Sequence, residues 1–318
     1  MVRRFGVLMG MLAALAAAGA ISPVAAAALP PAAGRVEERV FTNAAGTRRY
    51  RLYVPSAGAT GRPLMVWLHG CGKPGPMEAG HGLARVAEER GFVLAFPLQD
   101  RAANAENCWN WFADTDRHRG RGEASIIAGL TTDLIGQLHL DPRRVYAGGY
   151  SAGGAMTSVM GATYPDLYAA IAPCSGAPYG LDPTGAAAFA EMGERARPLP
   201  AFILQGVADE ISVYPLGRAN LGQWLATDDL ADDGHDNGSV SRVPSAATPE
   251  APGPGSPLPL VTETYTGRDG TELAAFVTSP AEHLVDAMLL YDDIGLGVQG
   301  RMMDFLLAHR GPAPGPRP

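Results

Sequence analysis

The sequence predicts an α/β fold, in which a mainly parallel sheet is covered by helices on both faces. Short apolar segments alternate with helix-length segments along most of the 318 residues, as is typical of strands buried between two layers of helices. The composition, 47% hydrophobic and 18% charged, is that of an ordinary globular domain. A chain of this length can bury enough surface to fold without a metal or a set of disulfides.

The expected elements form one large domain over residues 46–310. The strands are expected at residues 49–54, 64–68, 92–96, 145–149, 168–172, 202–205 and 274–277. The helices are expected at residues 78–90, 123–138, 152–164, 216–226 and 298–309. Gly91 is placed to end the first helix, and Pro97 is expected to end the strand that follows it.

Two segments interrupt this alternation. Residues 228–260 combine an acidic run with a stretch rich in Pro, Ala and Gly. They are expected to form an irregular insertion, either a solvated loop or a flap over the site. Residues 311–318, rich in Pro and Gly, are expected to be a disordered tail.

The first 28 residues have the pattern of a secretory signal peptide. Arg3 and Arg4 precede an apolar stretch, and small residues suited to signal peptidase follow it. The apolar stretch is short for a membrane span of about 20 residues. We therefore expect a secreted or periplasmic protein with no stable membrane association after cleavage, and a linker over residues 29–45.

Charge and cysteine content narrow the possible partners. The net charge is −7, and loss of Arg3 and Arg4 leaves 23 basic and 32 acidic residues, a net charge of −9. Nucleic acid is therefore not an expected partner. The three cysteines would lie in an oxidising compartment, where an odd number leaves at least one without an intramolecular partner. No cysteine or histidine spacing matches a zinc site, so no metal is expected.

The strongest motif is Gly149-Tyr150-Ser151-Ala152-Gly153, which fits G-x-S-x-G between an expected strand and an expected helix. That context is the nucleophile elbow of α/β-hydrolases, where a tight turn exposes the serine hydroxyl above the sheet. Ser151 is therefore the expected nucleophile. The elbow also refines the predicted fold class to an α/β-hydrolase.

A serine nucleophile needs a base, and the base needs an acid to orient it. Asp209 follows a buried strand at the position expected for the acid, with Glu210 as the alternative. Chain order leaves His235, His283 and His309 as possible bases. We assign His283, because it follows the last expected strand and precedes the final helix.

The oxyanion of the tetrahedral intermediate needs donors, commonly two backbone N–H groups. One is expected from Ala152, which follows the nucleophile. The other is expected from Cys71, in the loop His69-Gly70-Cys71-Gly72 after the strand at residues 64–68. His69 is then a hydrogen-bonded structural residue.

Four ordered motifs together resemble one known family. They are Leu68-His69-Gly70-Cys71, Cys108-Trp109-Asn110-Trp111-Phe112, the segment from Gly149 to Met156, and Ser175-Gly176-Ala177-Pro178-Tyr179-Gly180. The chain resembles the poly(3-hydroxybutyrate) depolymerase-type esterases over residues 49–224, and more loosely to the last helix. Feruloyl and acetylxylan esterases are relatives.

The resemblance implies extracellular ester hydrolysis by a Ser-Asp-His triad without a cofactor. It also implies a disulfide from Cys71 to Cys108, which makes Cys174 the odd thiol. One motif departs from the family, because its Gly-His-Ala-Trp-like turn is replaced by Ala281-Glu282-His283-Leu284. The chain also ends soon after the hydrolase domain, which favours soluble or amorphous esters over crystalline polyester.

The substrate is expected to be a poly- or oligo-3-hydroxybutyrate-like ester. Trp109, Trp111 and Phe112 are expected either to line an apolar groove or to pack in the core. The basic loop with Arg117, Arg119 and Arg121 is expected either to be solvated or to bind substrate carboxylates.

The second interpretation of the basic loop fits the poly(aspartic acid) hydrolases, which resemble the same family and cleave amides of a polyanion. The net charge of −9 counts against this alternative. A feruloyl- or acetylxylan-type carbohydrate esterase is a further alternative, and a catalytically dead polymer-binding relative is the least favoured.

Overall fold

The computed structural model describes residues 33–72, 82–253, 256–283, 289–290 and 296–313. The expected signal peptide at residues 1–28 lies outside the described residues. Among the described residues, no helix has the length and apolar character needed to cross a bilayer.

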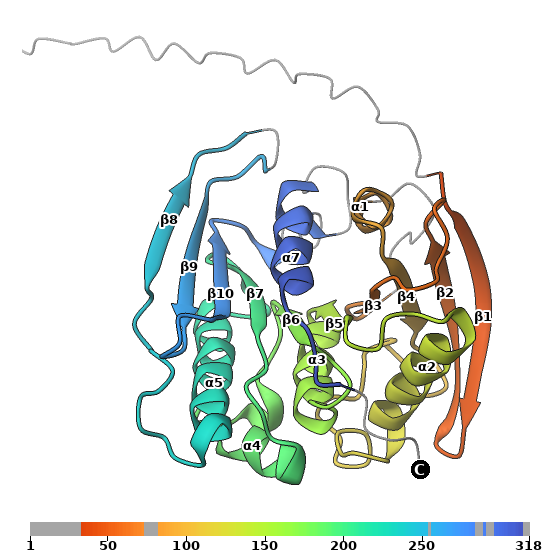
Figure 1. Cartoon of the computed structure of the whole chain (residues 1–318), viewed down its shortest axis with the longest axis horizontal. Coiled ribbons are helices and arrows are strands. Elements are labelled where there is room, and N and C mark those ends of the chain that lie inside the picture. Colours follow the sequence, from red (N-terminus) through yellow and green to blue (C-terminus); the bar gives the residue numbers. More distant parts are fainter. Residues whose placement is uncertain (1–32, 73–81, 254–255, 284–288, 291–295, 314–318) are drawn as a thin grey trace, which may run out of the picture. The chain divides into compact units, whose positions relative to one another are not determined.

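A ten-stranded sheet forms the centre of the folded domain (Figure 1), in the order β1-β2-β4-β3-β5-β6-β7-β10-β9-β8. The strands are β1 (Arg35–Asn43), β2 (Gly46–Val54), β3 (Leu64–Leu68), β4 (Val93–Leu98), β5 (Val145–Tyr150), β6 (Ala170–Cys174), β7 (Ala201–Gly206), β8 (Ala246–Glu250), β9 (Leu260–Thr266) and β10 (Glu272–Ser279). Strands β4, β3, β5, β6, β7 and β10 are parallel, and antiparallel strands extend both edges. This topology confirms the predicted fold class.

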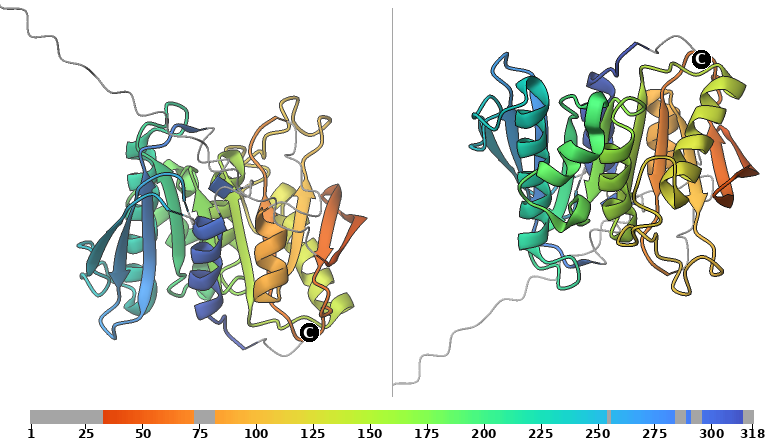
Figure 2. Two further views of the ribbon diagram at one scale, coloured as in Figure 1. Left: turned by 90° about the horizontal axis from the view of Figure 1, so that it is seen from above. Right: turned by 90° about the horizontal axis from the view of Figure 1, so that it is seen from below.

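Helices cover both faces of the sheet (Figure 2). They are α1 (Gly82–Arg90), α2 (Gly122–Leu138), α3 (Ala152–Thr163), α4 (Ala186–Met192), α5 (Tyr214–Asp233) and α7 (Leu296–Ala308), with short 3₁₀ helices η1 (Tyr179–Leu181) and η2 (Gly193–Arg195). Side chains of α2, α3, α4 and α5 share one hydrophobic cluster, and those of α1 and α7 share the other. Alternate side chains of β3 point to opposite faces of the sheet. Leu64, Val66 and Leu68 belong to the first cluster, and Met65 and Trp67 belong to the second.

The segment expected to be a linker contains a strand. Strand β1 spans Arg35–Asn43 and forms an antiparallel hairpin with β2, closed between Asn43 and Gly46. The Asn43 side chain accepts the Ala45 N–H at 2.9 Å, which stabilises the turn. This is an edge strand whose side chains are largely accessible, so it lacks the buried apolar pattern by which strands such as β3 and β5 were predicted.

Residues 228–260 are also more regular than expected. Helix α5 continues to Asp233 and ends at Gly234, whose φ of 87° suits a C-cap. Asp228 and Asp229 are buried, and their carboxylates accept backbone N–H groups instead of facing water: Asp228 from Leu199 at 2.7 Å, and Asp229 from Ser239 at 2.7 Å. Strands β8 and β9 then extend the sheet, so the segment is not an irregular insertion.

Strand β4 passes through Pro97, contrary to expectation. Its pairing with β3 ends at Ala95, and beyond that point the paired neighbour is β2. Pro97 therefore lies where no ladder bond to β3 is lost, which a proline tolerates. In the expected C-terminal tail, residues 311–313 have no regular structure, and residues 314–318 lie outside the described residues.

Candidate active site

The turn between β5 and α3 holds Ser151 in an unusual backbone conformation, with φ 57° and ψ −121°. A non-glycine residue adopts this conformation only where its surroundings enforce it. The flanking glycines allow a close approach: a Cβ on Gly149 would lie 2.5 Å from the Gly153 carbonyl oxygen, and one on Gly153 would lie 2.0 Å from that of Leu68. The two glycines of the motif are thus required by packing, and the turn is the strained nucleophile elbow.

Ser151, His283 and Asp209 form a continuous hydrogen-bonded chain. Ser151 Oγ lies 3.0 Å from His283 Nε2, and His283 Nδ1 lies 2.7 Å from Asp209 Oδ2. The other carboxylate oxygen, Asp209 Oδ1, accepts the N–H groups of Ile211 and Ser212 at 2.9 and 2.7 Å. These two bonds fix the carboxylate so that Oδ2 faces the imidazole.

The strand order explains why these distant residues meet. Ser151 follows β5, Asp209 follows β7 and His283 follows β10, all at the carboxyl ends of parallel strands. The loops after β7 and β10 are joined directly, because Val207 N–H donates to the Ser279 carbonyl at 2.8 Å and Ala208 N–H to that of Ala281 at 3.1 Å. Base and acid are therefore held by neighbouring strands.

The alternatives for acid and base lie elsewhere. Glu210 is exposed, and His235 is exposed in the loop after α5. His309 lies after α7 and lines a different cavity, described below. The structure therefore brings Asp209 and His283 to Ser151, and none of these three alternatives.

Tyr150 contacts the imidazole from the neighbouring position in the motif. Its ring lies against His283 with centroids 4.8 Å apart, and its hydroxyl donates a hydrogen bond to the His283 backbone carbonyl. The motif G-x-S-x-G does not single out this side chain, because it leaves the position open. An aromatic residue there was the only available signal.

The expected oxyanion donors border one pocket with the serine. Ala152 is the first residue of α3, so its N–H has no carbonyl partner within the helix. Cys71, Ser151 and Ala152 line the same pocket, and a Cβ on Gly70 would lie 3.2 Å from Ser151 Cβ. Both amides thus belong to residues that border the nucleophile, one at the start of α3 and one in the loop after β3.

His69 holds the loop that carries Cys71. Gln99 N–H donates to His69 Nε2 at 3.0 Å, so the ring proton is on Nδ1, which donates to the Gly70 carbonyl at 2.6 Å. Burial lowers the pKa of His69, so the neutral form is retained. The imidazole of His69 therefore has a structural role in this loop.

A disulfide joins Cys71 to Cys108, as the family resemblance implied. It connects the loop after β3 to the segment that contains both tryptophans. Cys174 is buried at the end of β6, where its carbonyl accepts the Ser151 N–H at 3.1 Å.

The pocket beside Ser151 is small and mostly apolar, with a volume of about 200 Å³. Its lining includes Trp111, Ile211 and Leu216. Trp109, in contrast, is fully buried and packs beside His69 with ring centroids 5.4 Å apart. Of the two tryptophans predicted to bind substrate, only Trp111 lines the pocket, and Trp109 is a core residue.

The arginines of the basic loop do not line this pocket. Arg119 binds both oxygens of Asp166 at 2.7 and 2.9 Å and lies over the Tyr164 ring, and Arg117 pairs with Asp114 at 3.1 Å. Arg121 is exposed immediately before α2. Of the two expectations for this loop, these contacts favour a solvated, ion-paired loop over a substrate-binding one. Asp166, which is remote in sequence, already neutralises Arg119.

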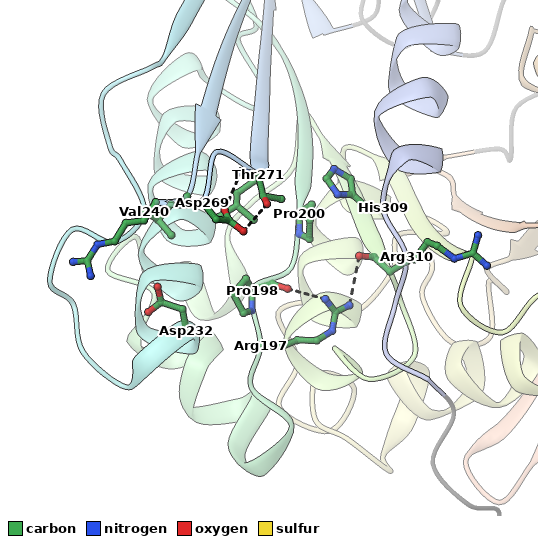
Figure 3. A pocket seen from close by; sticks show the side chains of 13 residues that line it. Arg197, Pro198, Pro200, Asp232, Val240, Asp269, Thr271, His309 and Arg310 are labelled. Atoms are coloured by element: carbon green, nitrogen blue, oxygen red, sulfur yellow. Dashed lines mark hydrogen bonds between the residues drawn. The ribbon is translucent and has the colours of Figure 1, made fainter.

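A second cavity of about 400 Å³ lies at the opposite ends of the strands (Figure 3). It is lined by residues that precede strands, including Ala169 and Pro200, and by Arg197 and His309. Burial, and then the charge of Arg197, lowers the pKa of His309 to about 4. Because Ser151 is not part of this larger cavity, volume alone does not identify the active site.

The sequence of this chain is similar to those of known proteins. A family model described as esterase PHB depolymerase matches residues 48–222. Poly(3-hydroxyalkanoate) depolymerase C of Paucimonas lemoignei is 37% identical over 149 residues, which are 47% of this chain and 36% of that protein. Feruloyl esterase B of Neurospora crassa is 37% identical over 137 residues, which are 42% of this chain and 46% of that protein. The matched segments thus span less than half of each relative.

Solved structures show the same fold. An acetyl xylan esterase from Aspergillus awamori superposes with a TM-score of 0.66 at 21% identity, covering 86% of this chain and all of that one. The feruloyl esterase module from Clostridium thermocellum gives a TM-score of 0.50 at 15% identity, covering 86% and 90%. At such low identity these likenesses concern the fold alone, whereas the family model matches more than half of the sequence. The chain therefore belongs to the esterase PHB depolymerase family.

Proposed function

We propose that this protein is a secreted serine hydrolase of carboxylic esters, with Ser151 as nucleophile, His283 as general base and Asp209 as the residue that orients the base. The observation that carries the proposal is the hydrogen-bonded chain of 3.0 and 2.7 Å from Ser151 through His283 to Asp209. Membership in an esterase family supports the same chemistry.

The geometry supports a two-step reaction through an acyl-enzyme. His283 Nε2 accepts the proton of Ser151 Oγ as that oxygen attacks the ester carbonyl. The imidazolium, stabilised by the Asp209 carboxylate, then gives the proton to the departing alkoxide, which leaves as an alcohol. Water next attacks the acyl-serine with the same base, and the products are a carboxylic acid and free Ser151.

The tetrahedral intermediate carries a negative oxygen in each step. We assign its stabilisation to the N–H groups of Ala152 and Cys71, on the two sides of the nucleophile. No step in this mechanism requires a cofactor or a metal.

We further propose a short hydroxyalkanoate ester, polymeric or oligomeric, as the substrate. The pocket of about 200 Å³ is small, and Trp111, Ile211 and Leu216 make its wall apolar. That environment suits a short acyl group such as 3-hydroxybutyryl. The depolymerase of Paucimonas lemoignei supports this substrate class.

A carbohydrate ester is the second candidate. Relatives named acetylxylan esterase and feruloyl esterase match a similar length of this chain at similar identity, and an acetyl group also fits a small apolar pocket. The poly(aspartic acid) alternative has less support, because Arg117 and Arg119 are paired with Asp114 and Asp166. The complete Ser151–His283–Asp209 arrangement argues against a catalytically dead relative.

Two observations support export. The first 28 residues have the pattern of a signal peptide, and the Cys71–Cys108 disulfide is of a kind that persists in oxidising compartments. We therefore propose that residues 1–28 are removed and that the hydrolase domain extends from β1 to about residue 310.

The substrate class is tested by side-by-side hydrolysis of 3-hydroxybutyrate oligomers, acetylated xylan, methyl ferulate and poly(aspartate), with Ser151→Ala as the control. We expect the highest kcat/KM on the hydroxybutyrate oligomers and loss of that activity in Ser151→Ala. Faster turnover of acetylated xylan or methyl ferulate would instead establish the carbohydrate esterase. Cleavage of poly(aspartate) alone would overturn the ester proposal.

A further inference from the structure

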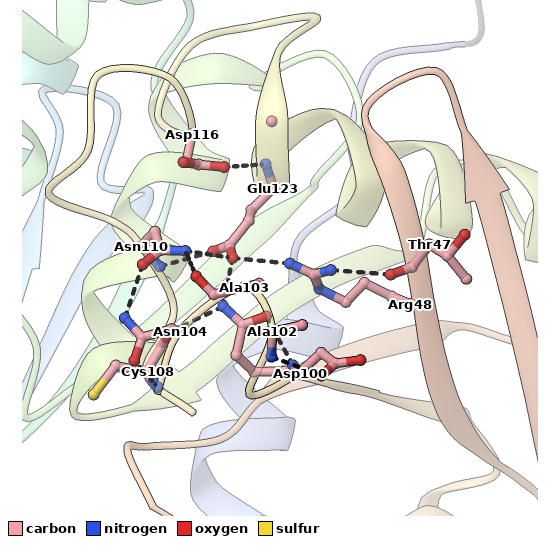
Figure 4. Close-up of polar contacts among 12 residues, drawn as sticks. Thr47, Arg48, Asp100, Ala102, Ala103, Asn104, Cys108, Asn110, Asp116 and Glu123 are labelled. Atoms are coloured by element: carbon pink, nitrogen blue, oxygen red, sulfur yellow. Dashed lines mark hydrogen bonds and ion pairs between the residues drawn. The ribbon is translucent and has the colours of Figure 1, made fainter. Parts of the chain in front are cut away.

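A buried carboxylate, Glu123, is surrounded by polar contacts from several segments of the chain (Figure 4). Glu123, in the first turn of α2, is 2% exposed. Its Oε1 accepts hydrogen bonds from Arg48 Nη2 at 2.9 Å, from Asn110 Nδ2 at 2.9 Å and from the Gln99 side-chain amide. Its Oε2 accepts the Asn110 backbone N–H at 2.7 Å. Because every one of these partners is a donor, the ionised carboxylate matches the site.

One chain of contacts leads from Glu123 to the oxyanion loop. The Gln99 side chain, held by Glu123, also donates to the Cys108 carbonyl at 2.9 Å. The backbone N–H of the same Gln99 donates to His69 Nε2 at 3.0 Å, and His69 Nδ1–H donates to the Gly70 carbonyl at 2.6 Å. Gly70 directly precedes Cys71, whose N–H is the proposed oxyanion donor.

A second chain leads to the pocket wall. Glu123 binds Asn110 through both its backbone and its side chain, and Asn110 precedes Trp111, which lines the pocket. Cys108 lies two residues before Asn110 in the sequence, and its disulfide to Cys71 leads back to the oxyanion loop. Both ends of the disulfide are thus tied to the same carboxylate.

From these contacts we propose that Glu123 is a positioning residue for the oxyanion hole, acting through Gln99, His69 and the Cys71–Cys108 disulfide. The inference rests on the proposed function, because it assumes that Cys71 donates to the intermediate. Glu123 does not touch substrate; it sets where the Cys71 N–H and the Trp111 side chain lie.

Placement of these groups affects the transition state more than substrate binding. An oxyanion-hole donor works only when it is aimed at the position that the developing oxyanion takes. A displacement of about 1 Å from the productive geometry can cost about 100-fold in rate. A loosened loop should therefore lower kcat/KM and weaken binding of a tetrahedral adduct, with little change in KM.

The variant Glu123→Gln tests this directly, since an amide keeps the shape but turns an NH₂ group toward donors. Asp228→Asn is the matched control, because Asp228 is equally buried, accepts the Leu199 N–H, and lies in α5 away from these contacts. The measurements are kcat and KM on p-nitrophenyl butyrate, Ki for an alkyl trifluoromethyl ketone, and the unfolding midpoint.

We expect Glu123→Gln to lower kcat/KM about ten-fold and to raise the ketone Ki by a similar factor, with KM within about two-fold, because both changes report transition-state stabilisation. Asp228→Asn should leave the kinetic constants of the folded protein unchanged, because the contact of Asp228 with the Leu199 N–H is remote from the Cys71 loop. If Glu123→Gln, like Asp228→Asn, left kcat/KM and the ketone Ki unchanged, the proposal would be overturned.

If Glu123→Gln does not fold, Gln99→Met tests the proposal instead. It removes the side-chain amide that links Glu123 to the Cys108 carbonyl, and it keeps the contacts of Glu123 with Arg48 and Asn110. A loss of kcat/KM with a matching rise in the ketone Ki supports the proposal, and wild-type values overturn it. A wild-type protein that hydrolyses no ester would instead overturn the proposed function itself.

Discussion

The hydroxyl of Tyr150 donates a hydrogen bond to the backbone carbonyl of His283, and the two rings lie with centroids 4.8 Å apart. The residue next to the nucleophile therefore supports the proposed base from a different strand. This contact gives His283 a fixed place although its sequence context, Ala281-Glu282-His283, departs from the family pattern. Five residues that follow, 284–288, lie outside the described residues.

Tyr150→Phe should lower kcat while keeping the ring contact. If a hydrogen bond worth about 1 kcal/mol helps to orient the imidazole, its loss lowers kcat about five-fold. Tyr146→Phe is the matched control, because Tyr146 lies on the same strand and donates to the His309 carbonyl at 2.9 Å, away from Ser151. Both variants should lose similar stability in urea unfolding. Equal kcat values for the two variants would remove the positioning role of Tyr150.

Replacing the disulfide with Cys71→Ser and Cys108→Ser should destabilise the protein. The two cysteines are 37 positions apart, and closing a loop of that length contributes roughly 3 to 4 kcal/mol in the chain-entropy model. Urea unfolding of the double variant measures this loss. Activity of the folded fraction should also fall, because the bridge joins the Cys71 loop to the Trp111 segment. Unchanged stability and unchanged activity would contradict both statements.

Arg117→Gln and Arg119→Gln should not discriminate between charged and neutral substrates. Each arginine is paired with a carboxylate, Asp114 or Asp166, and neither lines the pocket beside Ser151. The KM values for p-nitrophenyl hemisuccinate and p-nitrophenyl butyrate should therefore shift by the same small factor. A salt-sensitive rise in KM confined to the anionic ester would restore the polyanion interpretation.

His309 should make the protein acid-sensitive. Its pKa is lowered from 6.5 to about 4 by burial and by Arg197. Between these values the unfolded chain binds a proton that the folded protein does not, so stability falls as the pH drops from about 6.5 to about 4. His309→Gln should show a smaller loss in urea unfolding at pH 4.5 against pH 7.5. His235→Gln, at an exposed position, is the control, and the same pH dependence in both variants would refute the assignment.

Much of the fold was predictable because its signals are local. The apolar runs of β3, β5 and β7 are buried on both faces and need no knowledge of their neighbours. Strands β1 and β8, at the two edges of the sheet, and β9, between β8 and β10, were not predicted, because their partly exposed polar side chains resemble a loop. The buried carboxylates of Asp228 and Asp229 looked solvated for a related reason: their partners, Leu199 and Ser239, are backbone amides with no sequence signal.

The contrast between local sequence signals and contacts of distant segments also applies to the site. Ser151 was predictable from its motif, and Asp209 and His283 from chain order and strand ends. The side chains that support His283 and the Cys71 loop were not predictable, because Tyr150, Gln99 and Glu123 make their contacts between segments that are separate in sequence. The ion pair of Arg119 could not be predicted for the same reason, since Asp166 lies 47 positions away in sequence.

The central claim is that Ser151 is a nucleophile activated by His283. Mass spectrometry after reaction with a fluorophosphonate tests it most directly, on the wild type, Ser151→Ala and His283→Ala. We predict one adduct on the wild type, located on the peptide that contains Ser151, none on Ser151→Ala, and labelling of His283→Ala slowed by at least about 1,000-fold, since removing one member of a triad costs several orders of magnitude. Labelling that persists in Ser151→Ala, or a His283→Ala protein that reacts as fast as the wild type, would contradict the account.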